Sequence, residues 1–142
     1  MLTAKDIALV RTSFAMVLPI KAAAADLFYG RLFEIAPQLR SMFPKDLKEQ
    51  KAKLMAMIAA AVGGLHDLNT LVPHVKALGA RHAGYGVTVA HYAIVGDALM
   101  WTLERGLADA FTPEVRSAWA KVYAVLAGTM QAGAMEADAR AA

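Results

Sequence analysis

Apolar residues recur along most of the chain at the three- and four-residue spacing that is typical of amphipathic helices. The first run begins at Thr3, where a hydroxyl followed by Asp6 resembles a capping box, and Pro19 breaks it. A second start signal is the run Thr112-Pro113-Glu114, with a capping hydroxyl, a proline in the first turn and an acidic residue near the positive end of the helix dipole. No stretch alternates strictly as a half-buried strand does. The pattern therefore predicts an all-α chain.

About six main helices with short connections are expected, all in one domain spanning residues 1–142. In the second helix, Leu27, Phe28, Leu32 and Ile35 are predicted to be buried, and in the fourth we expect Gly79 to loosen the helix. The predicted helices cover residues 3–18, 21–36, 47–62, 71–82, 88–109 and 113 onward, with a short helical piece at 39–43.

The composition excludes several kinds of chemistry. The chain has 142 residues, of which 58% are hydrophobic, and no cysteine, so disulfides, iron–sulfur clusters and thiol nucleophiles are absent. No two histidines have the i, i+4 spacing of a helical zinc site, and the motifs GxSxG, GxxxxGK[ST] and GxGxxG do not occur. Hydrolysis, phosphoryl transfer and dinucleotide binding therefore have no visible machinery.

Charge and hydropathy argue against nucleic acid and membrane partners. The net charge is +3, and the lysines between residues 45 and 53 are interrupted by Asp46 and Glu49 without interleaved aromatic residues, which indicates a solvated helix face. The N-terminal apolar stretch faintly imitates a signal peptide, but charged residues interrupt it. No apolar run approaches the roughly 18–20 residues that span a bilayer. We therefore expect a cytoplasmic protein.

Among the four histidines, His82 has the most informative surroundings. A lone histidine on an apolar helix is more often structural than a ligand, so position alone carries little weight. His82, however, ends a helix that carries Val75 and Leu78 on the same side, and a glycine-rich segment follows it. A haem needs only one axial imidazole, and the Leu78 carbonyl one turn back is in reach of the second ring nitrogen. His82 is thus a candidate iron ligand.

Several separated motifs make the resemblance specific. The runs 27–33 (LFYGRLF), 50–55 (QKAKLM) and 81–96 (RHAGYGVTVAHYAIVG), together with Trp119 and Tyr123, resemble the single-domain bacterial haemoglobins, which are related to the globin domain of flavohaemoglobins. The likeness covers essentially the whole chain. It implies a globin fold in which the main helices surround haem b, with His82 as the proximal iron ligand.

The resemblance also implies roles for other residues. Tyr29 and Gln50 match a polar pair on the distal side, where both would donate hydrogen bonds to bound O2, and CO and NO are expected ligands as well. Leu54, one turn after Gln50, would form an apolar wall of the gas pocket. The remaining expected haem contacts are Phe43, which would pack flat on the porphyrin, the Leu78 carbonyl, Tyr92, and Lys53 and Arg81 near the propionates.

One position departs from the family pattern. Flavohaemoglobin-type globins join the proximal histidine, a tyrosine matching Tyr92 and a glutamate on the last helix, but the glutamate position falls on Ala134 here. Glu136 lies two residues further, a rotation of about 200° along a helix, so it is expected to face away. Peroxidase-like chemistry is accordingly disfavoured.

The main expectation is reversible, high-affinity O2 binding, and other functions stay open. The first alternative is a nitric oxide dioxygenase that an external reductase serves, and the second is a haem-based gas sensor; a haemless helical bundle would make Tyr29, Gln50 and His82 coincidences. The sequence does not decide between a monomer and a homodimer.

Overall fold

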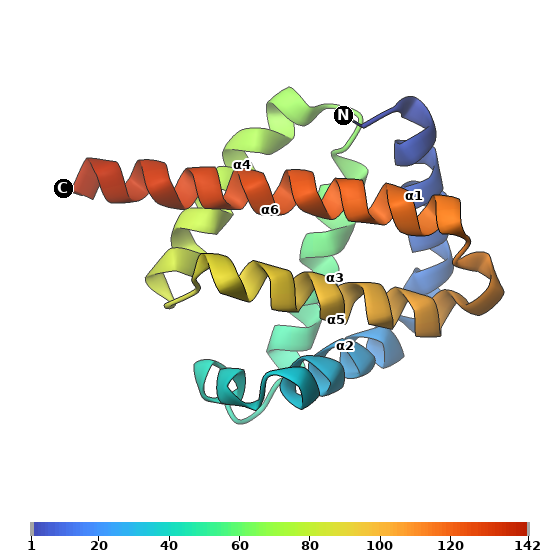
Figure 1. The fold of residues 1–142 in the computed structure, drawn as a ribbon, viewed down its shortest axis with the longest axis horizontal. Helices are drawn as coiled ribbons and strands as arrows, with labels where there is room; N and C mark the ends of the chain where they lie inside the picture. Colours follow the sequence, from blue (N-terminus) through green and yellow to red (C-terminus); the bar gives the residue numbers. More distant parts are fainter. Residues whose placement is uncertain (1, 142) are drawn as a thin grey trace.

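The computed structural model describes residues 2–141 and contains only helices within that range. α5 and α6 run side by side across the view of Figure 1, and α1, α3 and α4 cross them. The six α-helices are α1 (Ala4–Val17), α2 (Lys21–Ile35), α3 (Lys48–Gly63), α4 (Leu68–Gly84), α5 (Val89–Leu107) and α6 (Pro113–Ala141). Three short 3-10 helices, η1 (Leu18–Ile20), η2 (Pro37–Met42) and η3 (Ala108–Ala110), turn the chain between them.

The all-α prediction is confirmed, and most helix ends lie within one or two residues of the expected ones. The largest difference is the start of α4, which begins at Leu68 rather than residue 71. The Asp67 side chain accepts a hydrogen bond from the Thr70 backbone N–H, and this cap starts the helix a turn before Pro73. Pro73 therefore lies inside the helix, where it removes one backbone hydrogen bond and crowds the carbonyl one turn back.

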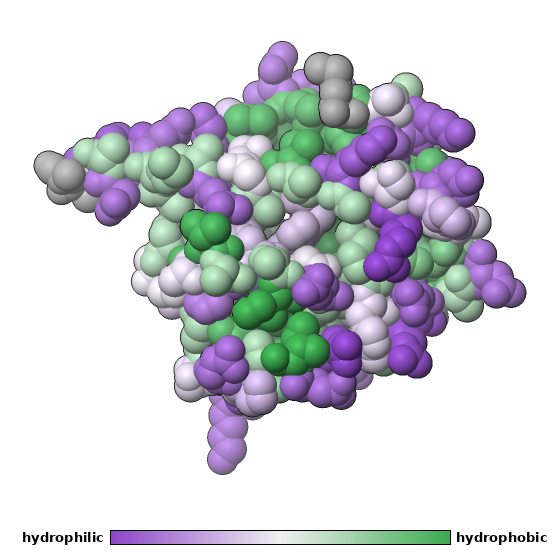
Figure 2. All heavy atoms as spheres, viewed as in Figure 1, coloured by the Kyte–Doolittle hydropathy of each residue, from purple (hydrophilic) through white to green (hydrophobic). Residues whose placement is uncertain are grey.

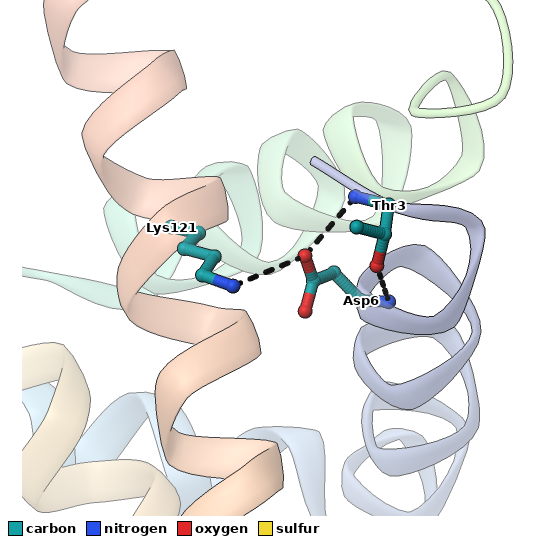
Figure 3. A network of polar contacts seen from close by, with 3 residues as sticks. All are labelled: Thr3, Asp6 and Lys121. Atoms are coloured by element: carbon teal, nitrogen blue, oxygen red, sulfur yellow. Dashed lines mark hydrogen bonds and ion pairs between the residues drawn. The ribbon is translucent and has the colours of Figure 1, made fainter. Parts of the chain in front are cut away.

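The capping box at the start of α1 is present as expected. The Asp6 N–H donates to the Thr3 hydroxyl, and the Thr3 N–H donates to the Asp6 carboxylate, both at 3.0 Å (Figure 3). The same carboxylate reaches Lys121 of α6, with an N–O distance of 3.5 Å. The hydrogen bond from the Thr3 backbone N–H is the main cause that lowers the pKa of Asp6. Because the same carboxylate contacts Lys121, the cap also attaches α1 to α6.

Two groups of buried side chains form the core. The larger one joins α1, α2, α3, α5 and α6, and the Trp119 indole donates a buried hydrogen bond to the Ser13 hydroxyl at 2.8 Å. The smaller one lies around α2 and η2 and includes Phe28, Tyr29 and Leu32. Ile35 was predicted to be buried, but this prediction is wrong: it is 39% exposed because α2 ends there and the following residues fill the core.

The effect predicted for Gly79 is also wrong, because this residue tightens the packing of α4. Gly79 is buried, and a methyl group there would collide with the backbone of Met130 on α6. Gly133 on α6 lies equally close to the backbone of Lys76 on α4. The two helices cross with their backbones in contact, which only residues without a side chain allow.

The N-terminal stretch is more apolar than expected for a water-facing segment. By length and composition alone, Ala4–Ile35 could cross a membrane, in contrast to the expectation that no such run exists. In the structure this stretch is divided by η1, and Val10, Phe14 and Val17 are buried in the protein core. Core packing therefore accounts for part of its apolar content.

The outer surface reflects this arrangement. In Figure 2, hydrophilic residues dominate the rim, and apolar residues gather on the face that α5 crosses. The C-terminal part of α6 extends beyond the other helices and has a mixed surface (Figures 1 and 2). The crossing of α6 over α4 lies just before this extension, so α4 is held by the inner part of the last helix.

Candidate functional site

His82 lies in the last turn of α4 and is half-buried. Its Nδ1 atom is 2.9 Å from the Leu78 carbonyl oxygen. Because a carbonyl only accepts, this geometry assigns the ring proton to Nδ1 and leaves the lone pair on Nε2. The Tyr85 ring lies beside the imidazole, with the ring centres 5.8 Å apart. The arrangement holds the imidazole in one orientation, as a metal-ligating histidine requires.

A second hydrogen bond attaches the start of α5 to α6 near the same end of the molecule. The Tyr123 hydroxyl donates to the Tyr92 carbonyl oxygen at 2.6 Å. Burial raises the pKa of both tyrosines, that of Tyr123 more strongly. Gly96 makes room for the Tyr123 ring, because a methyl group at Gly96 would lie 2.8 Å from a ring carbon. Sequence reasoning found Tyr92 but not this contact.

Tyr29 on α2 is the centre of an aromatic cluster. Its ring is buried and lies 5.1 Å from Phe28, 6.0 Å from Phe33 and 5.6 Å from Phe43, measured between ring centres. The rings of Phe28 and Phe43 meet Tyr29 edge to face, a favourable geometry for aromatic pairs. Phe43 itself is half-buried at the end of η2. The cluster fixes the position of the Tyr29 hydroxyl and connects it to Phe43.

Gln50 and Leu54 occupy successive turns of α3 beside this cluster. Burial raises the pKa of the Tyr29 hydroxyl, and a side-chain hydrogen bond with Gln50 opposes the rise. Leu54 is half-buried and, with Phe28, lines a small apolar cavity of about 20 Å³ that reaches Trp119. Thr102 also lines this cavity, and its hydroxyl donates a hydrogen bond to the Ala98 carbonyl rather than pointing an unpaired polar group into the space. The structure therefore brings the sequence-predicted polar pair together next to a dry wall.

The helices that carry these two groups of residues are neighbours in sequence but not in packing. Within residues 2–141, α4 packs mainly on α6, whereas α3 packs on α2 and α1. Half-buried apolar side chains pack against the smaller core group around Tyr29, namely Phe43, Leu47, Leu54, Ile94 and Val95. One imidazole on α4, an aromatic and apolar surface, and two polar side chains near α3 are the donor set and surroundings that fit a haem.

Other predicted site residues lie at the surface. Lys53 and Arg81 are exposed, and none of the ion pairs between described residues involves them. Glu136 is ion-paired with Lys76 at 2.9 Å, so its carboxylate is directed to α4's outer side and not to His82. No group of three histidine or carboxylate side chains suited to a bare metal ion occurs among the residues the structure describes.

One histidine has a structural role that the sequence pattern did not reveal. The Thr88 backbone N–H donates to His91 Nδ1 at 2.9 Å, and the two residues form a capping box at the start of α5. A histidine in place of the usual Glu or Gln hides this signal from a motif search. The bond keeps the segment between His82 and α5 in place.

The comparisons with known proteins agree with this architecture. The family model described as Globin matches residues 26–130. Neuroglobin from Danio rerio is 32% identical over 93% of this chain and 92% of its own length, and neuroglobin from Tetraodon nigroviridis is 31% identical with the same coverage. The flavohemoprotein of Bacillus subtilis is 30% identical over 89% of this chain. The matched part makes up 33% of the length of that flavohemoprotein.

The fold also matches a solved structure. An engineered carbene transferase, made from a proposed nitric oxide dioxygenase of Rhodothermus marinus, superposes with a TM-score of 0.85 at 26% identity. The match covers 98% of this chain and 97% of that one. The helices and their order therefore agree with one family.

Proposed function

This chain belongs to the globin family, and from that premise we propose that it is a haem protein that reversibly binds O2, and also CO and NO, with His82 as the iron ligand. The proposed cofactor is haem b. The single observation that carries the proposal is the hydrogen bond between His82 Nδ1 and the Leu78 carbonyl. It supplies an oriented imidazole on a helix that packs mainly on α6.

When bound, the haem supplies the iron that holds the gas, and the protein supplies its surroundings. On the proximal side, the Leu78 carbonyl holds the proton on His82 Nδ1 and keeps Nε2 available as a donor. On the distal side, the Tyr29 hydroxyl and the Gln50 amide are donors for a polarised gas ligand. Each such bond to a charged acceptor contributes roughly 1.5–3 kcal/mol, or about 10- to 150-fold in affinity. Tight binding with slow O2 release follows.

The other expected contacts complete the proposed pocket. Phe43, at the end of η2, would pack on the porphyrin, and Leu54 would keep the distal side apolar. Tyr92 would border the proximal side, and the exposed Lys53 and Arg81 are free to meet the propionates. These roles follow from the family resemblance and are compatible with the half-buried or exposed positions of the side chains.

Nitric oxide dioxygenation with an external reductase is the second candidate. The flavohemoprotein and the Rhodothermus marinus protein favour it, since the latter is described as a proposed nitric oxide dioxygenase. Strong peroxidase-like chemistry is disfavoured, because a backbone carbonyl and not a carboxylate orients the imidazole. The nearest candidate carboxylate on α6, Glu136, is paired with Lys76 instead. Sustained conversion of NO to nitrate with a flavin reductase and NADH would establish this activity, and a single stoichiometric turnover would exclude it.

Haem uptake tests the main proposal. The purified wild-type chain is expected to show a haem Soret band that shifts on reduction and on addition of CO. His82→Ala should abolish stable haem retention, whereas His74→Ala, an exposed histidine on the same helix, should leave the spectrum unchanged. A wild-type chain that takes up no haem, or a His82→Ala variant with a wild-type spectrum, contradicts the proposal.

A further inference from the structure

The carbonyl that orients His82 belongs to the peptide bond between Leu78 and Gly79. Gly79 is buried, and a methyl group on its Cα would overlap the carbonyl oxygen, the carbonyl carbon and the Cα of Met130. The peptide that sets the direction of the imidazole is therefore directly joined to the atom that touches α6. A displacement of Gly79 necessarily moves the hydrogen-bond acceptor of His82.

A reciprocal contact lies one turn earlier on α4. Gly133 of α6 touches the backbone of Lys76, and a methyl group at Gly133 would overlap the Lys76 carbonyl and Cα. The side chain of Lys76 also forms an ion pair with Glu136 at the same crossing, where both side chains are more than a third exposed. Exposed ion pairs contribute little, so the close approach of the helices depends on the two glycines.

We infer that Gly79 is a positioning residue for His82: its contact with Met130 sets the place of the Leu78 carbonyl and, through it, the orientation of the imidazole. The inference rests on the proposed function in that His82 is taken as the iron ligand. Protein interiors are close-packed, so an added methyl group at this crossing must displace or tilt α4 against α6. The imidazole follows, because its Nδ1–H stays directed by a carbonyl that has moved.

The chain offers matched controls on the same two helices. A methyl group at Gly84 on α4 or at Gly128 on α6 would meet nothing within 4 Å outside the local helix. Gly84→Ala and Gly128→Ala thus make the same chemical change without the clash. Both substitutions also raise helix propensity by the same kind of increment as Gly79→Ala.

Two readouts report on His82 separately from overall stability. In the haem-free chain, nitrogen NMR of the imidazole gives its tautomer and the strength of the Nδ1–H hydrogen bond. In the haem-loaded chain, resonance Raman spectroscopy gives the iron–imidazole stretching band, and transfer to an acceptor apoprotein gives the rate of haem loss. Circular dichroism and urea unfolding of each variant record whether it folds.

Gly79→Ala is expected to shift the imidazole signals and the iron–imidazole band, and to weaken haem retention by about 10- to 100-fold, as loss of an orienting partner typically does. Gly133→Ala should shift them in the same sense but less, because its clash lies one turn further from Leu78. Gly84→Ala and Gly128→Ala should match the wild type.

A folded Gly79→Ala variant with wild-type imidazole signals overturns the inference. Where Gly79→Ala does not fold, Gly133→Ala decides: unchanged His82 signals despite a lower unfolding midpoint would show that the crossing only stabilises the fold. If the wild-type chain binds no haem, the proposed function fails, and the NMR arm on the haem-free chain still tests the inference.

Discussion

The two sides of the proposed haem pocket are built in different ways. On the proximal side, backbone atoms make the decisive contacts: the Leu78 carbonyl orients His82, the Tyr92 carbonyl accepts from Tyr123, and Gly79 touches the backbone of α6. On the distal side, side chains make them, through the aromatic cluster around Tyr29 and its neighbour Gln50. The difference indicates that the proximal side fixes the imidazole, whereas the distal side is open to adjustment by single substitutions.

The largest expected effect is on the rate of O2 release, which should depend on the distal side and not on the proximal side. Tyr29→Phe keeps the aromatic packing and removes one donor, so O2 dissociation should accelerate by about 10- to 150-fold. Stopped-flow displacement of O2 by CO measures the rate. Tyr85→Phe, a change at an exposed tyrosine beside His82, serves as the control and should not alter the rate. An unchanged rate in Tyr29→Phe would refute the distal role.

A smaller effect is expected on the proximal side, and it should appear in stability. Tyr123→Phe removes the part-buried hydrogen bond to the Tyr92 carbonyl, which still accepts from the N–H one helical turn on, so the loss costs about 0.5–1.5 kcal/mol. The measurement is the free energy of unfolding in urea. The O2 dissociation rate should stay close to that of the wild type, and a large change in that rate would break the proposed division between the two sides.

Alkaline pH should weaken the fold through the buried tyrosines of both sides. Burial raises the pKa of Tyr29, Tyr92 and Tyr123 above the ordinary tyrosine value of about 10, so above that pH the unfolded chain releases protons that the folded chain retains. Because the unfolded state then binds fewer protons, stability falls as the pH rises through about 10 and beyond. Tyr123→Phe should flatten this loss in urea titrations at pH 9–11, more than the exposed change Tyr85→Phe does.

The smallest expected effect lies outside both sides. Ala108, at the corner after α5, has φ of 50° and ψ of −119°, a conformation that suits glycine. Ala108→Gly relieves backbone strain at some entropic cost, for a net gain of about 1 kcal/mol. Thermal unfolding should show a higher midpoint with unchanged haem spectra. A lower midpoint would mean that the corner is not strained.

Local signals accounted for most of the helices and for the residues of the candidate site. The Thr3–Asp6 capping box, the start at Thr112 and the break at Pro19 depend on neighbours within a few residues, so they are readable from sequence. The hydrogen bond between His82 and the Leu78 carbonyl is equally local, because it spans one helical turn. The sites of Tyr29 and Gln50 followed from the family motifs, and the structure brings the two side chains together.

Contacts between distant segments were decided only by the tertiary structure. From the sequence, Gly79 was expected to loosen its helix, because a glycine lacks a side chain. The sequence does not reveal that the Met130 backbone of α6 occupies the space where that side chain would lie. Ile35 carries the apolar spacing of a core residue, yet the turn after α2 leaves it exposed. Sequence determined where most helices form, since their start and stop signals depend on neighbours along the chain, and the family motifs in it indicate which side chains are candidates to bind iron and gas. The position of the imidazole depends on how α4 crosses α6, which only packing in three dimensions sets.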